Sequence, residues 1–251
     1  MYHNQVTKIG KVKLTDFKVL SFDCYGTLID WEAGLLESLR PLSSQLQSGL
    51  CDHEVLESYA RHEADQQLKT PSRLYSELMA TVYQRLAEEW SIAVSQDECR
   101  QFGQSLKNWP AFPDSAESLA YLKEHYMLAI LSNVDNESFA ASNRKLKVTF
   151  DAIYTAQDIG TYKPSDNNFH YLIESLDQQG IHRTEILHTA QSLFHDHVPA
   201  NRNDLASCWI DRKHDSESSG ATPRPAEMPE FDFRFQSLAE LVEAHKMQLA
   251  G

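Results

Sequence analysis

Short apolar runs recur along the chain, and each ends where polar residues begin. The clearest lie at residues 19–22, 127–131, 186–187 and 208–210, and a weaker one lies at 152–154. Continuous apolar runs of this kind are typical of strands that are buried on both faces of a parallel sheet. The pattern therefore predicts a parallel sheet whose strands are far apart in the sequence.

Between these runs, apolar residues recur at intervals of three and four, which predicts helices with one buried face. The expected helices cover residues 54–67, 74–89, 116–124, 137–145, 167–176 and 237–249. Strands that alternate with helices predict an α/β fold with a doubly wound, Rossmann-like parallel sheet.

The stretch 32–112, after the first strand, reads as helical and is too long for a single crossover connection. We therefore predict a helical cap domain over 32–112, inserted into a catalytic core formed by 1–31 and 113–251. Within that core, residues 211–230 are polar, contain three prolines and lack periodicity. Such a segment is expected to form a flexible loop.

Composition narrows the functional classes. The chain has 251 residues, of which 41% are hydrophobic, and its net charge is −13. This charge disfavours nucleic acids and anionic membranes as partners. The four cysteines are far apart, which argues against a zinc knuckle and a disulfide scaffold. There is no apolar run long enough to span a bilayer and no signal-peptide pattern, so we expect a cytoplasmic protein.

The segment 22–30, FDCYGTLID, carries the strongest chemical signal. It places Asp23 at the carboxyl end of the first strand, where parallel sheets bind their ligands. A carboxylate in this position can attack a substrate and form a covalent intermediate. The alternative is that Asp23 only caps the helix that follows, as aspartate often does.

Polar residues also follow the other expected strands. Ser132 and Asn133 end the second strand, Lys163 stands directly before a proline in a loop, and Asp196 lies just beyond the 186–187 run. This ordered set resembles the signature of the haloacid dehalogenase superfamily. Tyr25 stands where the phosphatases of that superfamily have a second aspartate, so the chain is most similar to the type II 2-haloacid dehalogenases.

The resemblance implies roles for the catalytic residues. Asp23 would attack a substrate carbon and form an ester, and Lys163 would keep Asp23 ionised and steady developing charge. Thr27 would hold the oxygens of Asp23 or the substrate. Asp196 would orient or activate the water that hydrolyses the ester. No metal or other cofactor is implied.

The resemblance also implies a substrate-binding set, and the substrate would be a small carboxylate such as a 2-haloacid. The set consists of Tyr25, Ser132, Asn133, Phe169, Ser192, His195, Arg61 and Arg73. The two arginines are the nearest candidates in the cap for the cation that binds the departing halide. The rest of the cap is expected to close over the substrate with apolar side chains from around Tyr59, Leu74, Tyr75 and Leu78.

Several positions depart from the dehalogenase pattern. Phe169 replaces a tyrosine, and residues 191–195 read Gln-Ser-Leu-Phe-His where that branch has Ser-Ser-Asn-Ala-Trp. These changes leave the reaction class better supported than the substrate. Hydrolysis of another small electrophile, such as an epoxide, stays open.

Two further alternatives stay open. A phosphatase of the same fold would need Mg²⁺ as its cofactor, but Tyr25 and Gln191 replace the acidic groups that it would use. A catalytically inactive relative would act as a binding module. His188, His195 and His197 cluster around one strand end, but they lack the usual zinc spacing. A small molecule is the expected partner, and a homodimer is open.

Overall fold

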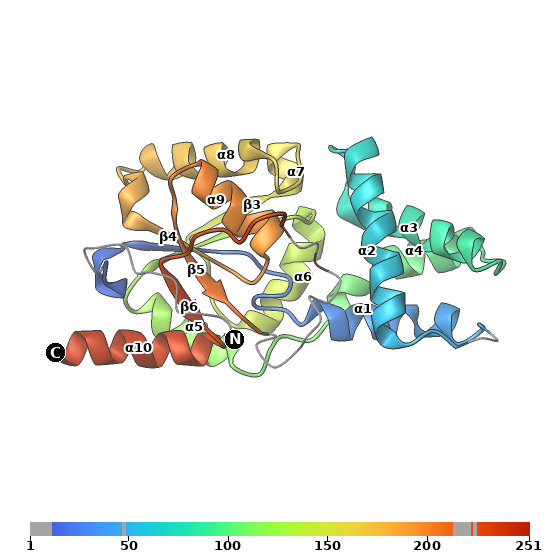
Figure 1. Ribbon diagram of the computed structural model, residues 1–251, viewed down its shortest axis with the longest axis horizontal. Helices are drawn as coiled ribbons and strands as arrows, with labels where there is room; N and C mark the ends of the chain where they lie inside the picture. Colours follow the sequence, from blue (N-terminus) through green and yellow to red (C-terminus); the bar gives the residue numbers. More distant parts are fainter. Residues whose placement is uncertain (1–11, 47–48, 213–221, 223–224) are drawn as a thin grey trace.

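A parallel sheet forms the centre of the molecule (Figure 1). The computed structural model describes residues 12–46, 49–212, 222 and 225–251. In this part of the chain the sheet has six strands in the order β3-β2-β1-β4-β5-β6. The strands are β1 (Val19–Phe22), β2 (Met127–Ser132), β3 (Ala152–Thr155), β4 (Ile186–Ala190), β5 (Ala206–Ile210) and β6 (Phe233–Phe235). The predicted apolar runs are thus confirmed as strands of a Rossmann-like sheet.

Helices cover both faces of the sheet, as expected for a doubly wound fold (Figure 1). One face is covered by α5 (Ser115–Lys123), α6 (Asn136–Leu146) and α10 (Leu238–Ala250), and the other by α8 (Asp166–Asp177) and α9 (Val198–Arg202). The short α7 (Ala156–Ile159) precedes α8, and a π-helical turn, η4 (Leu193–His197), follows β4. Short 3-10 helices are η1 (Leu14–Asp16), η2 (Ser105–Asn108) and η3 (Arg183–Glu185).

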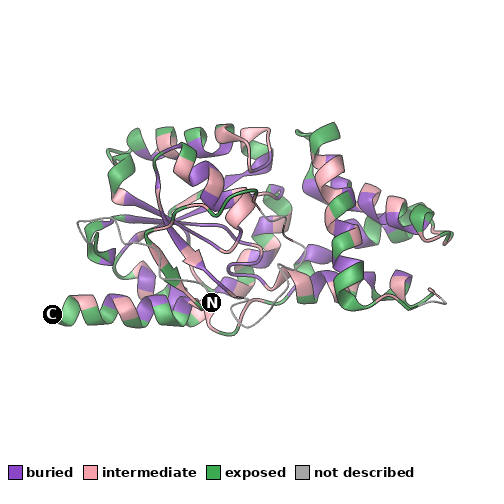
Figure 2. Cartoon of the chain, viewed as in Figure 1, coloured by how far each residue is buried: buried purple, intermediate pink, exposed green. Residues whose placement is uncertain are grey.

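Alternation along β1 explains how the sheet separates two hydrophobic cores. Val19 packs into the core under α8, whereas Leu20 and Phe22 pack into the core shared with α5, α6 and α10. Successive side chains of a strand point to opposite faces, so both faces must be apolar when both are covered. Figure 2 shows this burial along the strands and on the inward faces of the helices.

A helical cap lies beside the sheet (Figure 1). It contains α1 (Trp31–Ser43), α2 (Asp52–Lys69), α3 (Tyr75–Glu89) and α4 (Gln96–Gly103). The chain leaves the core and returns to it at neighbouring positions. Asp30 N donates to Pro110 O over 2.8 Å, and Phe112 N donates to Leu28 O over 3.0 Å. These hydrogen bonds join the two connections at the base of the cap.

Close helix packing stabilises the cap. A Cβ atom at Gly103 would lie 2.2 Å from Ser76 O, so only glycine allows α4 to approach α3 this closely. At the base of the cap, a Cβ atom at Gly34 would collide with the buried ring of Trp109 at 2.2 Å. These contacts hold the cap helices together and anchor them to the connection that leads back to the core.

The loop predicted over 211–230 falls mostly outside the described residues, since 213–221 and 223–224 are not among them. Nearby, Glu230 N donates to Asn201 Oδ1 over 2.8 Å, which fixes the chain before β6. In the described residues no helix is long and apolar enough to cross a membrane.

Candidate active site

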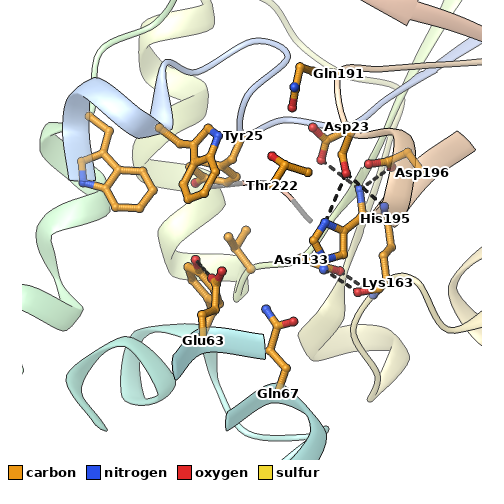
Figure 3. Close-up of a pocket in the computed structure, with 15 residues that line it drawn as sticks. Asp23, Tyr25, Glu63, Gln67, Asn133, Lys163, Gln191, His195, Asp196 and Thr222 are labelled. Carbon is orange, nitrogen blue, oxygen red and sulfur yellow. Dashed lines mark hydrogen bonds and ion pairs between the residues drawn. The ribbon is translucent and has the colours of Figure 1, made fainter. Parts of the chain in front are cut away.

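A lysine and two aspartates meet at the carboxyl edge of the sheet (Figure 3). Lys163 Nζ donates to Asp23 Oδ1 over 2.8 Å, to Asp196 Oδ1 over 2.6 Å and to Leu131 O over 3.0 Å. Asp23 directly follows β1, which lies between β2 and β4, and Asp196 lies in the η4 turn after β4. The sheet order therefore brings together residues that are up to 173 positions apart (196 minus 23).

Burial and charge act on this cluster in opposite directions. Burial alone would lower the pKa of Lys163, but the adjacent carboxylates of Asp196 and Asp23 raise it above its usual range. Burial raises the pKa of Asp23, an effect that Lys163 opposes. Burial would also raise the pKa of Asp196, yet Lys163 and His188 hold it well below its usual range. Lys163 is thus charged, and Asp196 is its most firmly ionised partner.

Thr27 fixes the second oxygen of Asp23. Its hydroxyl donates to Asp23 Oδ2 over 2.7 Å and accepts from Gln191 N over 2.9 Å. Gly26 makes this turn feasible because its φ of +97° suits glycine. A side chain at Gly26 would also press on Trp31 at 3.1 Å. Both oxygens of the Asp23 carboxylate are therefore held by hydrogen bonds.

Asn133 positions the lysine loop. Its Oδ1 accepts from Lys163 N over 2.7 Å, and its Nδ2 donates to Lys163 O over 3.0 Å. Both ends of the amide bind the lysine loop, and Asn133 also lines the cavity, so its contact with a substrate stays a prediction. Ser132 is buried, and its Oγ has no hydrogen-bond partner within the described chain. Ser132 does not line the cavity described below.

Asp196 has a further partner in His188, a residue that the sequence suggests only as a metal ligand. His188 Nε2 lies 2.9 Å from Asp196 Oδ1, and His188 Nδ1 lies 2.8 Å from Ser21 Oγ. An ionised carboxylate only accepts, so His188 donates from Nε2 to Asp196, while its Nδ1 pairs with the hydroxyl group of Ser21. The signal in the sequence was a histidine at an inward position of the apolar strand ILHTA.

Phe169 lies beneath the site and not in it. Its ring packs edge-on against His188 with centroids 5.3 Å apart, within the core under α8. It does not line the cavity. The structure therefore corrects its predicted role as a substrate contact, because phenylalanine has no polar group that would favour a place at the cavity wall.

A small cavity separates Asp23 from the cap (Figure 3). Its volume is about 80 Å³. Its lining residues are Asp23, Tyr25, Trp31, Glu63, Gln67, Tyr75, Trp109, Asn133, Val134, Lys163, Gln191, Ser192, His195, Asp196 and Thr222. The predicted residues Tyr25, Asn133, Ser192 and His195 thus line the same cavity as the charged cluster.

His195 contributes a neutral ring to this wall. Its backbone N donates to Ser192 Oγ over 3.0 Å, and its Nδ1 lies 3.2 Å from the same oxygen. Burial lowers the pKa of His195 to about 4. On the other side, Tyr25 OH lies 2.8 Å from Ser142 Oγ, so its hydroxyl group is engaged within the core.

Neither predicted arginine reaches the cavity. Arg61 makes a bidentate ion pair with Glu89 at 3.0 and 2.9 Å, and its side chain is 58% exposed. Arg73 Nε donates to Glu77 Oε2 over 3.2 Å, and its side chain is 38% exposed. Neither residue is among the lining residues. The predicted halide-binding cation is therefore corrected: glutamates on the outer surface of the cap hold both guanidinium groups.

The cap instead presents residues that the sequence did not indicate. Glu63 and Gln67 of α2 lie one helical turn apart and face the cavity (Figure 3). Of the apolar cap residues expected to cover the substrate, Tyr75 lines the cavity, whereas Tyr59 and Leu78 are fully buried within the cap. Leu74 is 38% exposed.

The protein itself engages three of the four carboxylate oxygens of Asp23 and Asp196. Lys163 occupies Oδ1 of both Asp23 and Asp196, and Thr27 occupies the other oxygen of Asp23. Mg²⁺ prefers several oxygen ligands in octahedral geometry. The described residues contain no group of three or more His, Cys, Asp or Glu side chains that could hold a metal ion. An ammonium group thus takes the place between the two carboxylates.

Comparison with solved structures agrees with the architecture. The L-2-haloacid dehalogenase PA0810 is 20% identical, with a TM-score of 0.74 over 94% of this chain and 100% of its own. An L-2-haloacid dehalogenase from Xanthobacter autotrophicus with chloropropionic acid covalently bound is 17% identical, with a TM-score of 0.74 over 92% and 98%. The magnesium-bound HAD-hydrolase YfnB from Bacillus subtilis is 18% identical, with a TM-score of 0.71 over 92% and 99%.

Comparison with models of protein families identifies the family of the chain. No curated protein matches the chain significantly. The model of the haloacid dehalogenase-like hydrolase family matches residues 17–188. This range contains β1 to β3, the cap, Asp23 and Lys163. The chain belongs to the haloacid dehalogenase-like hydrolases.

Proposed function

We propose that this hydrolase cleaves a small molecule through a covalent ester of Asp23, formed by attack on carbon. The observation that carries the proposal is the fixed carboxylate of Asp23. Lys163 and Thr27 hold its two oxygens at the floor of a cavity. Because the nucleophile is already held in one orientation, the reaction does not carry the entropic cost of orienting it.

The second half of the reaction would use Asp196. Its Oδ1 accepts from Lys163 and His188, whereas Oδ2 has no partner among the described residues. Asp196 also lines the cavity. In this proposal Oδ2 accepts a proton from the water that attacks the ester carbonyl of Asp23. Lys163 balances the charge on both carboxylates throughout.

The arrangement of charges counts against a 2-haloacid as substrate. The ammonium group of Lys163 makes three hydrogen bonds to the protein, and His195 is neutral near pH 7. Among the described residues, the rest of the cavity lining includes carboxylates and no arginine. Within this part of the chain, a substrate carboxylate and a departing halide would therefore both lack a cation. We propose a neutral electrophile in place of the haloacid.

A single turnover in oxygen-18 water tests the covalent step. With enzyme in excess over 2-bromopropionate, 1,2-epoxybutane or β-propiolactone, attack of water on the ester carbonyl leaves one labelled oxygen in Asp23. We expect mass spectrometry of the Asp23 peptide to show this label for at least one probe. Label found only in the product, with Asp23 unlabelled, would contradict an ester at this residue.

The same measurement separates this function from that of a phosphatase. In an aspartyl-phosphate mechanism, water attacks phosphorus, so the label leaves with phosphate. 4-Nitrophenyl phosphate with Mg²⁺ is the matching probe. Turnover of that probe with labelled phosphate would replace our proposal.

A further inference from the structure

Displacement at carbon fixes where the leaving group must lie. The nucleophile and the leaving group stand on opposite sides of the attacked carbon. Asp23 lies on the core side of the cavity, so the leaving group points toward the cap. Figure 3 shows Glu63 and Gln67 on that side, facing the cavity from α2. The chemistry of this wall therefore indicates which leaving group the site accepts.

Glu63 is held in one orientation at this wall. Tyr75 OH donates to Glu63 Oε1 over 2.5 Å, and Tyr75 is the first residue of the next cap helix, α3. Among the described residues Glu63 has no other hydrogen-bond partner. Glu63 lines the cavity, so its second oxygen, Oε2, is the one left to meet a substrate.

Among the described residues, no cation pairs with Glu63. Tyr59 and Tyr75 of the cap and Tyr162 of the core loop before Lys163 lie near it. Burial raises the pKa of all three phenols, so they are neutral. The groups across the cavity are Asp23, Lys163, His195 and Asp196. Burial raises the pKa of Glu63 to about 7, although the hydrogen bond from Tyr75 acts in the opposite direction. A large share of Glu63 is thus protonated near neutral pH.

A carboxyl group at this position suits oxygen and not halide. A departing halide is stable as an anion and needs a cation, whereas a departing alkoxide needs a proton. We propose that Glu63 is a catalytic acid that protonates an oxygen leaving group, and that the substrates are small neutral epoxides. This inference rests on the proposed function of Asp23. The aromatic walls from Trp31 and Trp109 suit an uncharged, mostly apolar body.

The steps balance as a hydrolysis. An oxygen of Asp23 forms a bond to an epoxide carbon, the carbon–oxygen bond of the ring breaks, and its electron pair takes the proton of Glu63. Water then attacks the ester carbonyl and releases the second alkoxide. One proton of that water passes through Asp196 to the alkoxide, and the other returns to Glu63. The product is a vicinal diol, and the enzyme is unchanged.

Replacement of Glu63 by glutamine tests the acid directly. Mass spectrometry follows ester formation on Asp23 with two probes of equal chain length, 1,2-epoxybutane and 1-bromobutane. We expect Glu63→Gln to slow esterification by the epoxide about a hundredfold or more. Esterification by 1-bromobutane should be slow in both proteins because the departing bromide meets no cation. Bromide needs no proton, so Glu63→Gln should not slow this reaction further. Glu57→Gln makes the same chemical change on an exposed part of α2 and should alter neither rate.

The outcomes separate the two proposals. Equal losses with both probes, or no loss with the epoxide, would overturn the role of Glu63 while Asp23 still forms an ester. Wild-type protein that is labelled by 1-bromobutane and not by 1,2-epoxybutane would overturn the epoxide assignment alone. Absence of any ester on Asp23 would overturn the proposed function.

The pH dependence of the rate distinguishes a catalytic role of Glu63 from a structural one. The rate with the epoxide should fall above about pH 7 as Glu63 loses its proton. Glu63→Gln should remove this alkaline limb. Tyr75→Phe removes the hydrogen bond that lowers the pKa of Glu63, so the limb should shift to higher pH. An alkaline limb that stays in place in both variants would contradict the assignment.

Discussion

His188 lies 2.9 Å from Asp196 Oδ1, so a histidine inside β4 orients a carboxylate in the turn that follows the strand. Lys163 bonds to the same oxygen over 2.6 Å. Two donors on one oxygen fix the rotation of the carboxylate and leave Oδ2 free of protein partners within the described chain. The two oxygens of Asp196 therefore have different surroundings.

Asp23→Asn should abolish turnover while the fold is kept. The amide is nearly isosteric with the carboxylate, but it is a far weaker nucleophile. Turnover and thermal melting would be measured on the same preparation. A folded variant with wild-type activity would rule out Asp23 as the nucleophile.

Lys163→Met should damage both activity and stability. Loss of one preorganised charge costs about a hundredfold or more in rate. The change also leaves two buried carboxylates without their cation, which costs about 3–5 kcal/mol of unfolding free energy. Urea unfolding and turnover measure the two effects. Lys69→Met removes an exposed i,i+4 pair and serves as the control, with little expected change in either.

2-Chloropropionate should release no chloride in the presence of this enzyme. Arg61 and Arg73 are held by Glu89 and Glu77, and the described residues that line the cavity offer neither the halide nor the carboxylate an unpaired cation. A chloride-selective electrode checks the release directly. Steady release that is lost in Asp23→Asn would restore dehalogenation as the reaction.

Turnover should survive treatment with EDTA. Lys163 occupies the position between Asp23 and Asp196, and its ammonium group supplies the positive charge there. The measurement is turnover before and after chelation and again after Mg²⁺ is added. Loss of activity on chelation, with recovery on addition of Mg²⁺, would favour a metal-dependent reaction.

Stability should fall as the pH drops from about 6.5 toward 4. Burial lowers the pKa of both His195 and His197 to about 4, so the unfolded chain binds their protons first. Their contribution is complete above about pH 6.5 and is lost as the pH falls through the folded values. Urea midpoints across this range measure the slope.

His197→Gln should reduce that slope, because the ring of His197 is fully buried against Ser207 Oγ and Ala190 O. His53 is about half exposed, so His53→Gln is the matched control and should keep the wild-type slope. An unchanged slope in His197→Gln would show that other groups set the acid sensitivity.

The sheet and its polar edge could be predicted because their signals are local. Apolar runs that end at Asp23 and Ser132 indicate strand ends without any knowledge of contacts with distant residues. Asp196 followed from the same logic. His188 gave a weaker signal, since a histidine in a buried strand can be a metal ligand or a positioning group. Only the structure shows Asp196 beside it.

The cap wall could not be predicted because it depends on how α2 rotates against the core. Arg61 and Glu63 are two residues apart, so on a helix they point about 200° from each other. Only one of them can face the cavity. The composition of α2 does not decide which, because charged residues lie around much of its surface. Packing of Tyr59 and His62 inward settles the rotation in favour of Glu63.

The hydrogen bonds from Asp30 N to Pro110 O and from Phe112 N to Leu28 O have an evolutionary consequence. They make the entrance to and the exit from the cap a single junction, across which a short linker or an unrelated insert could be joined. Exchange of the segment between them would alter which molecules are admitted, while the lysine and the aspartates stay on the sheet edge. Substrate selectivity and bond cleavage can thus evolve independently within one chain.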